Sequence, residues 1–305
     1  MIRLIAAAIS ALFLLDSAAH ATDRVRLGYG RLVTNDLVGD GHDRWRTGSV
    51  ASSRIWGPDW TGSAPDRFGD LIELRFNAEI LAPENVAAPA PGDRPYAGAV
   101  SLGLHTHFQQ RGTEFAVGGD LVFTGPQTRM DDLQGLVHDI VGGNDLSGGT
   151  RANQIGNDLN PTAVVEMGRT LELGQTGLLR PFVEGRAGVE TLVRVGADLS
   201  FGHVGHGELL VRDPVTGHRY RTVLNEVPGY SFLVGGDVAY VDHSEFLPSN
   251  RGLQLSDQRS RLRAGMHWQS EKGHRAFYGL TWLDKEFKGQ RNSQIVGSVR
   301  LHVDF

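Results

Sequence analysis

The chain ends with the sequence SVRLHVDF, which occupies positions 298–305. Every second residue from Val299 to Phe305 is apolar, and the residues between them are polar or charged. This period of two is typical of a β-strand with one apolar and one polar face. Bacterial outer-membrane barrels commonly end on such a strand with an aromatic last residue, because their assembly machinery reads it. The stretch therefore predicts an outer-membrane β-barrel that the barrel assembly machinery inserts.

The same alternation recurs along the chain, most clearly in residues 100–108, 114–123 and 261–268. One face of each stretch is apolar and the other is polar, as expected when lipid lies outside a barrel and a polar lumen inside. A soluble β-sandwich would also alternate. Strands of about ten residues, the terminal aromatic residue and an export signal favour the membrane barrel.

The export signal is predicted in residues 1–21. Arg3 supplies a positive charge, an apolar run follows, and Ala19-His20-Ala21 is a typical small-x-small cleavage site. The apolar run is too short to cross a bilayer as a helix, although a retained N-terminal anchor helix is the alternative. We therefore expect a signal peptide over 1–21 and one barrel domain over 22–305.

The predicted fold is all-β, a transmembrane antiparallel barrel of twelve strands. An even number puts both chain ends on the periplasmic side, so the loops after odd-numbered strands are extracellular. The segment 202–228 is long for a periplasmic turn, and the sequence offers no physical reason for it. The strands are expected near residues 24–34, 44–55, 68–81, 96–108, 112–124, 161–172, 179–188, 192–201, 229–241, 258–269, 275–284 and 295–305.

One extracellular loop, residues 125–160, is predicted to contain a short helix. Its apolar residues recur at helical spacing and are bounded by Gly-Pro at 125–126 and Gly-Gly at 142–143. We expect an amphipathic helix on or near the barrel mouth, or alternatively a plug that closes the mouth. The apolar residues of this pattern are Leu133, Leu136, Val137, Ile140 and Val141.

Composition excludes several kinds of site. The chain has no cysteine, so neither a disulfide nor a thiolate nucleophile is available. Its net charge of −5 gives no support for a nucleic-acid partner.

Polar clusters gather at the ends of the first six strands, and strand parity places all of them at the outer end of the barrel. This convergence is the main argument from the residues for a functional site. The clusters are Asn35-Asp36, Asp43-Arg44 with Thr47, Pro83-Glu84-Asn85, Asp93-Arg94-Pro95-Tyr96, Gln134 with His138, and Asn153-Gln154 with Asn157.

These residues offer the chemistry of water activation. His138 would be the general base, because imidazole titrates near neutral pH. Asp36 and Asn35 would bind a hard cation such as Ca²⁺, which accepts carboxylate and amide oxygens and can stabilise an oxyanion. Thr47 would orient water or substrate. We assign substrate contacts to Arg94, Tyr96, Gln134 and Gln154.

Other interpretations of single residues remain open. Asp43-Arg44 and Asp93-Arg94 are expected to be structural ion pairs at the strand ends. A serine hydrolase that uses His243 and Ser244 is a rival, but neighbouring residues on a strand face opposite sides, so His243 cannot easily take the proton of Ser244.

At these positions the sequence resembles the lipid A 3′-O-deacylase family of calcium-dependent outer-membrane barrels. The matching pieces occur in family order over nearly the whole chain after the export signal. They are Asn35-Asp36, Asp43-Arg44-x-x-Thr47-Gly48, Asp93-Arg94-Pro95-Tyr96-Ala97-Gly98, Gly125-Pro126 with Gln134-x-x-x-His138, Gln154-x-x-Asn157, Leu179-Arg180-Pro181-Phe182, Lys285-Glu286-Phe287 and the terminal Phe305.

The resemblance implies a twelve-stranded barrel that hydrolyses the 3′ acyl ester of lipid A near the outer leaflet, with lipopolysaccharide as substrate and outer-membrane lipid around it. It implies a histidine base at His138, with Asn35, Asp36 and Thr47 beside it. Some members carry a lysine in the loop after strand 3, but residues 81–92 contain none. Either Arg94 replaces it or the oxyanion depends on the metal. A phospholipase-type acyl hydrolase and a non-catalytic channel or structural barrel remain the alternatives.

Overall fold

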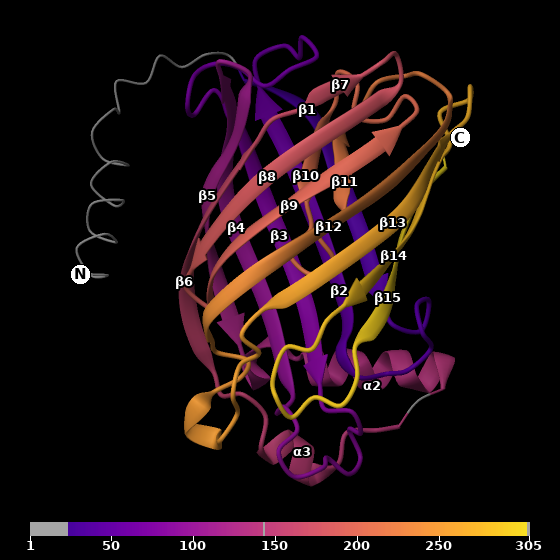
Figure 1. The fold of residues 1–305 in the computed structure, drawn as a ribbon. Coiled ribbons are helices and arrows are strands. Elements are labelled where there is room, and N and C mark those ends of the chain that lie inside the picture. The colour runs from indigo at the N-terminus through magenta and orange to yellow at the C-terminus, as the bar shows by residue number, and fades with distance from the viewer. Residues whose placement is uncertain (1–23, 143, 304–305) are drawn as a thin grey trace, which may run out of the picture.

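The computed structural model describes residues 24–142 and 144–303. The expected signal peptide and the terminal Phe305 lie outside these residues. The described chain forms one antiparallel sheet that closes into a barrel (Figure 1). Its twelve strands of nine or more residues are β1 (Val25–Asn35), β2 (Trp45–Gly57), β3 (Leu71–Ala82), β4 (Ala97–Gln110), β5 (Thr113–Thr124), β6 (Asp158–Gly168), β8 (Gly177–Ala187), β9 (Glu190–Phe201), β12 (Gly229–Ser244), β13 (Arg259–Gln269), β14 (Arg275–Leu283) and β15 (Gln294–His302).

Two pairings close the sheet on itself. The first strand pairs with the last, with Asn35 opposite Gly297, and β6 pairs directly with β8. The short strand β7 (Leu171–Leu173), which separates them in sequence, pairs with β8. Closure removes the exposed edges that an open sheet would leave. The all-β class and the twelve-stranded antiparallel barrel predicted from the sequence are thereby confirmed. None of the described helices is long and apolar enough to cross a bilayer.

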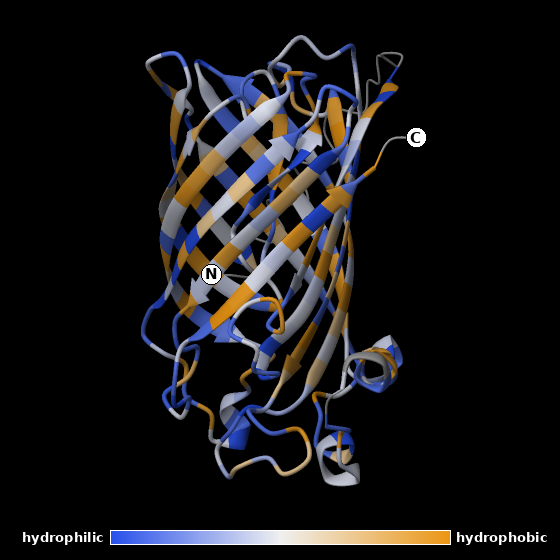
Figure 2. Ribbon diagram, turned by 90° about the vertical axis from the view of Figure 1, so that its right-hand side faces the viewer, coloured by the Kyte–Doolittle hydropathy of each residue, from blue (hydrophilic) through white to orange (hydrophobic). Residues whose placement is uncertain are grey.

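The wall alternates between an apolar outer face and a polar inner face. On β4, Leu102 and Leu104 are 52% and 59% exposed, whereas Ser101 before them and His105 after them are buried. Figure 2 shows this alternation as orange and blue bands along the strands. An outer face of exposed leucine, valine and phenylalanine is the surface that a hydrocarbon environment requires.

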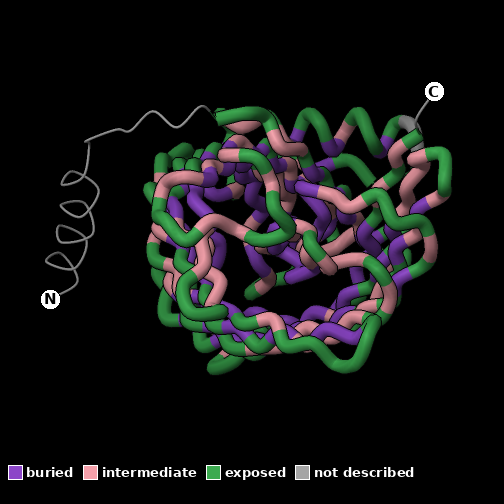
Figure 3. Tube along the Cα trace, turned by 90° about the horizontal axis from the view of Figure 1, so that it is seen from above, coloured by how far each residue is buried: buried purple, intermediate pink, exposed green. Residues whose placement is uncertain are grey.

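The segment 202–228, unexplained from the sequence, contains a hairpin of β10 (Leu209–Arg212) and β11 (Arg219–Val223). This hairpin lies inside the barrel, where Tyr220 packs against Leu32 of β1 and Phe277 of β14. Figure 3, which looks down the barrel, shows backbone that lies inside the ring of strands. On β1, a side chain at Gly28 would come within 2.1 Å of the Thr222 carbonyl oxygen, so only glycine permits this close approach.

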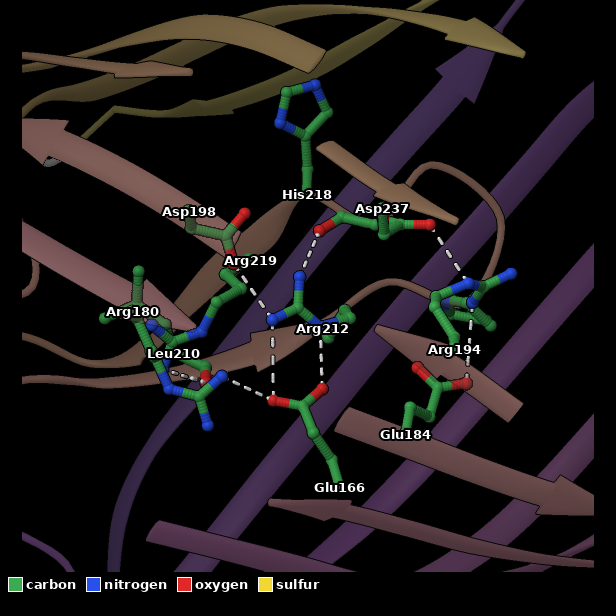
Figure 4. A network of polar contacts seen from close by, with 12 residues as sticks. Glu166, Arg180, Glu184, Arg194, Asp198, Leu210, Arg212, His218, Arg219 and Asp237 are labelled. Atoms are coloured by element: carbon green, nitrogen blue, oxygen red, sulfur yellow. Dashed lines mark hydrogen bonds and ion pairs between the residues drawn. The ribbon is translucent and has the colours of Figure 1, made fainter. Parts of the chain in front are cut away.

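Charged side chains fill much of the remaining lumen. Arg212 of the hairpin donates hydrogen bonds to Glu166 at 2.6 Å and to Asp198 at 2.9 Å, and Arg180 also donates to Glu166 (Figure 4). Buried charges of this kind are tolerated because each carboxylate meets guanidinium groups and the hydrogen bonds are satisfied. The network ties the hairpin to β6 and β9.

The end of the barrel opposite the described chain ends carries the long loops and the helices, and we call it the loop end. It holds α2 (Met130–Val141) and α3 (Gly148–Ala152), with single 3-10 turns η1 (Pro126–Thr128) and η2 (Ser249–Arg251). The predicted short helix in the loop 125–160 is therefore present as α2. Other residues of the loop end, namely Ile155, Phe246, Leu247, Leu253 and Phe287, belong to two buried apolar clusters.

We predict that the hairpin is what occludes the lumen. Replacing residues 208–224 by a short Gly-Ser linker should turn a non-conducting barrel into one that passes ions in planar bilayers, because the apolar and ionic contacts of the hairpin disappear. Folding of the variant is checked by heat-modifiable gel mobility, and Glu226→Gln in the same turn is the control. Equal conductance of wild type and deletion would contradict an occluded lumen.

Candidate active site

The predicted site residues of β1 and β2 lie on the outer surface of the wall. Thr34 points into the lumen, where it hydrogen-bonds Ser298 at 2.8 Å, so the next residue, Asn35, points outward. In β2 the register shifts between Arg46 and Gly48 opposite β3, and Thr47 is the extra residue of this bulge. Asn35 donates from Nδ2 to the Thr47 carbonyl oxygen at 2.9 Å. The bulge thus brings Thr47 beside Asn35 on the outer surface.

Asp36 follows β1 and is fully buried. Its Oδ2 accepts a hydrogen bond from the Arg44 backbone at 2.9 Å, whereas its Oδ1 has no partner among the described residues. Burial raises the pKa of the Asp36 carboxyl to about 8, and repulsion from the Asp43 carboxylate adds to the shift. An unpartnered carboxylate oxygen in this setting requires either a proton or a cation.

Helix α2 completes the site with its polar face. His138 Nε2 lies 2.9 Å from Asp43 Oδ2, and the Gln134 amide lies 3.5 Å from both oxygens of the same carboxylate. The Thr47 hydroxyl donates to Asp43 Oδ1. His138 Nδ1 lies 2.9 Å from the Asn144 carbonyl oxygen, and because a carbonyl only accepts, Nδ1 carries the proton. The imidazole thus holds Nε2 toward the Asp43 carboxylate, which also only accepts, so Nε2 donates a proton in this contact.

Helix α2 lies outside the barrel wall. On β4, Ala97 and Ala99 belong to a buried cluster inside the barrel, so Gly98 between them faces outward. A side chain at Gly98 would come within 2.5 Å of Met130 Cβ at the start of α2. In Figure 1 the helix lies across the lower end of the strands and reaches beyond their outline. The site lies where the outer surface of the wall meets the inner face of this helix.

Five predicted residues thus come together, namely Asn35, Asp36, Thr47, Gln134 and His138. The other predicted substrate contacts lie apart from them. Arg94 is buried at the mouth, where its Nη1 donates to Glu286 at 2.6 Å. Gln154 donates to the Arg151 carbonyl oxygen at 3.1 Å.

Tyr96 is intermediate between the two groups. It is buried, and its hydroxyl has no partner among the described residues. Burial raises the pKa of this phenol, and the Asp131 carboxylate at the start of α2 adds to the shift, with a smaller addition from Asp43. The hydroxyl is therefore a neutral donor near the site.

The two expected ion pairs between sequence neighbours are wrong. Arg44 pairs with Asp40 at 3.1 Å, and Arg94 pairs with Glu286. Asp43 is instead the carboxylate partner of His138, a role that the sequence interpretation missed. The signal was present in the spacing Asp43-x-x-x-Thr47, because this spacing lets the Thr47 hydroxyl reach back to Asp43 across the bulge.

The serine alternative is not supported by the geometry. Ser244 is buried and donates to Glu190 at 2.9 Å, whereas His243 is exposed and pairs with Glu245 at 3.0 Å. The two side chains point to opposite sides of β12, as the strand geometry predicted.

A cation site was predicted at Asn35 and Asp36. The described residues contain no cluster of three or more histidine and acidic side chains that could hold a metal ion. The unpartnered Oδ1 of Asp36 nevertheless fits a hard cation, with the Asp43 carboxylate nearby. Calcium accepts amide, backbone and water oxygens as well as carboxylates, so a shortage of acidic residues does not conflict with it.

The fold and the site define an outer-membrane β-barrel with a histidine–carboxylate cluster on the outside of its wall. The family model described as outer membrane protein LpxR matches residues 5–305. The chain therefore belongs to the LpxR family, which confirms the lipid A deacylase family that its motifs resemble.

One solved structure agrees with this fold. LpxR from Salmonella typhimurium superposes with a TM-score of 0.71 at 18% identity, covering 89% of this chain and 98% of that chain. The β domain of the Bordetella autotransporter BrkA matches more weakly, with a TM-score of 0.41 at 12% identity and coverage of 90% and 97%. Comparison with curated protein sequences gives no match.

We predict that Asp36 makes stability fall with rising pH when divalent cations are chelated. Its carboxyl pKa is 3.8 in the unfolded reference and about 8 in the fold. Between these values the folded protein keeps a proton that the unfolded chain has released. The contribution of Asp36 to the free energy of unfolding is therefore largest below pH 3.8. It declines by about 1.4 kcal/mol per pH unit until about pH 8.

The temperature of the gel-mobility transition, measured at pH 6 and pH 8 in chelator, checks this sign. Asp36→Asn should remove much of the difference, and Asp132→Asn on the exposed side of α2 should keep it. A wild-type transition that is higher at pH 8 than at pH 6 would refute the assignment.

Proposed function

We propose that the protein hydrolyses the ester-linked acyl chain at the 3′ position of lipid A, with the loop end at the outer leaflet. The observation that carries this proposal is the position of His138, Asp43 and Thr47 on the outward side of the wall, beneath α2. Lipid A sits in the outer leaflet with its ester near the boundary between sugar and acyl chains. A site at the outer rim of the wall meets that ester without lifting the lipid from the membrane.

In the proposed reaction, a water molecule replaces Asp43 at His138 Nε2, and Nε2 removes its proton as the water oxygen attacks the ester carbonyl carbon. The Asn144 carbonyl holds the Nδ1–H, which fixes the ring, and Asp43 accepts a hydrogen bond from the protonated Nε2 and stabilises the imidazolium. When the carbon–oxygen bond breaks, His138 returns the proton to the sugar oxygen. The products are a free fatty acid and a 3′ hydroxyl group.

Asp36 and Asn35 would hold Ca²⁺ beside this reaction. The bound cation would supply electrostatic stabilisation of the carbonyl oxygen as it gains negative charge. The position of Arg94 supports this division of roles, because its guanidinium is committed to Glu286 inside the mouth. Of the two substitutes for the absent lysine, the cation is therefore the one that the site favours.

Replacing the base tests this mechanism. His138→Ala should lower fatty-acid release from purified lipopolysaccharide by about 10²–10⁴-fold, because general-base catalysis typically contributes that much. Release is measured by mass spectrometry of both the acid and the deacylated lipid A. His243→Ala is the control, since that exposed histidine only pairs with Glu245. Full activity of a folded His138→Ala would rule out the mechanism, and loss of activity in Ser244→Ala alone would favour the serine route.

The cation has its own test. Excess chelator should abolish turnover and added Ca²⁺ should restore it, because the cation would supply the charge that stabilises the carbonyl oxygen. Asp36→Ala should raise the calcium concentration needed for half-maximal rate or eliminate turnover, whereas Asp132→Ala should match wild type. Undiminished turnover in excess chelator would remove the metal from the proposal.

A phospholipase is the second candidate, because the same cluster could attack a glycerol ester. Parallel assays on lipopolysaccharide and on phospholipid vesicles separate the two substrates. The filled lumen speaks against a channel, since the hairpin and its ion pairs occupy the path that solutes would follow.

A further inference from the structure

Helix α2 buries its polar face and exposes its apolar face, which is the reverse of a helix on a soluble domain. Its buried residues are Asp131, Gln134 and His138, which are 9%, 4% and 8% exposed. Its outward face carries Leu133, Leu136 and Val137, which are 45%, 59% and 38% exposed. A helix that packs on a protein in water turns its apolar face inward. The surroundings of α2 on its outer side should therefore be apolar.

The loop after β1 repeats this arrangement on the other side of the site. Leu37 and Val38 are 44% and 43% exposed, directly after the buried Asp36. The Val38 carbonyl accepts a hydrogen bond from the hydroxyl of Tyr278, which is itself exposed on the outside of β14. A side chain at Gly297 would come within 2.1 Å of this carbonyl oxygen. The loop thus folds outward over β15 and lies on the outer surface of the wall.

Both apolar surfaces continue the outer face of the barrel. Val33 and Ile295, at the loop end of β1 and β15, are 39% and 37% exposed on that face. Leu37 and Val38 lie just beyond them, and α2 lies outside β4 on the same surface. The band that contacts lipid in an outer-membrane barrel therefore extends over the loop and the helix without a polar break in these residues.

We propose that the outward face of α2 and the tip at Leu37-Val38 are embedded in the acyl region of the outer leaflet. They form two membrane-inserted flaps on either side of Asp36 and His138, and their partner is the hydrocarbon of the bilayer. A lipid acyl chain then enters the site sideways from the membrane, between helix and wall. The insertion is independent of the proposed reaction, whereas the sideways entry rests on it.

Site-directed spin labelling measures the insertion directly, because the chain has no cysteine of its own. Leu136→Cys carries the probe, and Asp132→Cys, 68% exposed on the side of the same helix, is the matched control. In proteoliposomes we compare, for each label, the ratio of its accessibility to oxygen and its accessibility to a water-soluble nickel chelate. This ratio should be at least several-fold higher for the label at 136 than for the label at 132. Equal nickel accessibility at the two positions would overturn the insertion.

A second copy of the chain is the competing occupant of the apolar face. Two labels at position 136 in contact would broaden each other's spectra, and dilution with unlabelled protein would sharpen them, which would also overturn the proposal. Neither result depends on catalysis, so a barrel that inserts α2 but hydrolyses nothing would refute the proposed function and leave the insertion standing.

The sideways entry is tested by turnover. Leu136→Ser should reduce fatty-acid release from substrate embedded in vesicles several-fold while leaving release from detergent-dispersed substrate close to wild type. The same loss in both media would overturn the sideways route, because it would show that Leu136 supports the site itself.

Discussion

Alternation of side chains across a closed wall is the constraint on which the rest of this structure depends. In a barrel every strand residue faces either the lumen or the outside, and a closed sheet has no edge at which a site could form. The residues Thr34 and Asn35 show the consequence, since one joins the polar interior and the other the candidate site. The bulge at Thr47 adds one residue to the outer surface and shifts the pairing of β2 with β3 by one residue. Placement of the site outside the wall follows from these two local features.

The side chains that alternation points into the lumen include many charged groups, which form ion pairs with one another. Because many inward positions are charged, the lumen must pair these charges or hold water. Here Glu166 and Asp198 meet arginines of the wall and of the hairpin, and the mouth repeats the pattern around Arg46 and Glu286, 2.5 Å apart. Such networks are costly to break one partner at a time. These networks make the lumen a support for the wall, and the candidate site lies on the outer side of the wall.

The period of two predicted the twelve strands, and strand parity predicted which loops share an end, because both depend on a repeating local pattern. The hairpin of β10 and β11 could not be found in this way. Its strands are four and five residues long, and it is buried on all sides inside the barrel, so its sequence has no single apolar face. The sequence also predicted that α2 is amphipathic but not which face packs, because periodicity does not report the polarity of the surroundings.

The site itself was predicted in part for similar reasons. Asn35, Asp36, Thr47, Gln134 and His138 were predicted to lie together because they end strands or share one side of a helix at the same end of the barrel. Asp43 was assigned to Arg44 because the two are neighbours in sequence, yet the bulge turns it toward His138. Contacts between β2 and a helix almost a hundred residues later follow from tertiary packing alone.

A structure with Ca²⁺ and a lipid A analogue that carries a non-hydrolysable ether at the 3′ position tests the central claim most directly. The account predicts that the 3′ linkage lies between α2 and the outer surface of β1 and β2, next to His138 Nε2, with the cation on the free oxygen of Asp36. An analogue bound inside the lumen, or at the mouth beside Arg94 with its 3′ linkage far from His138, would contradict it.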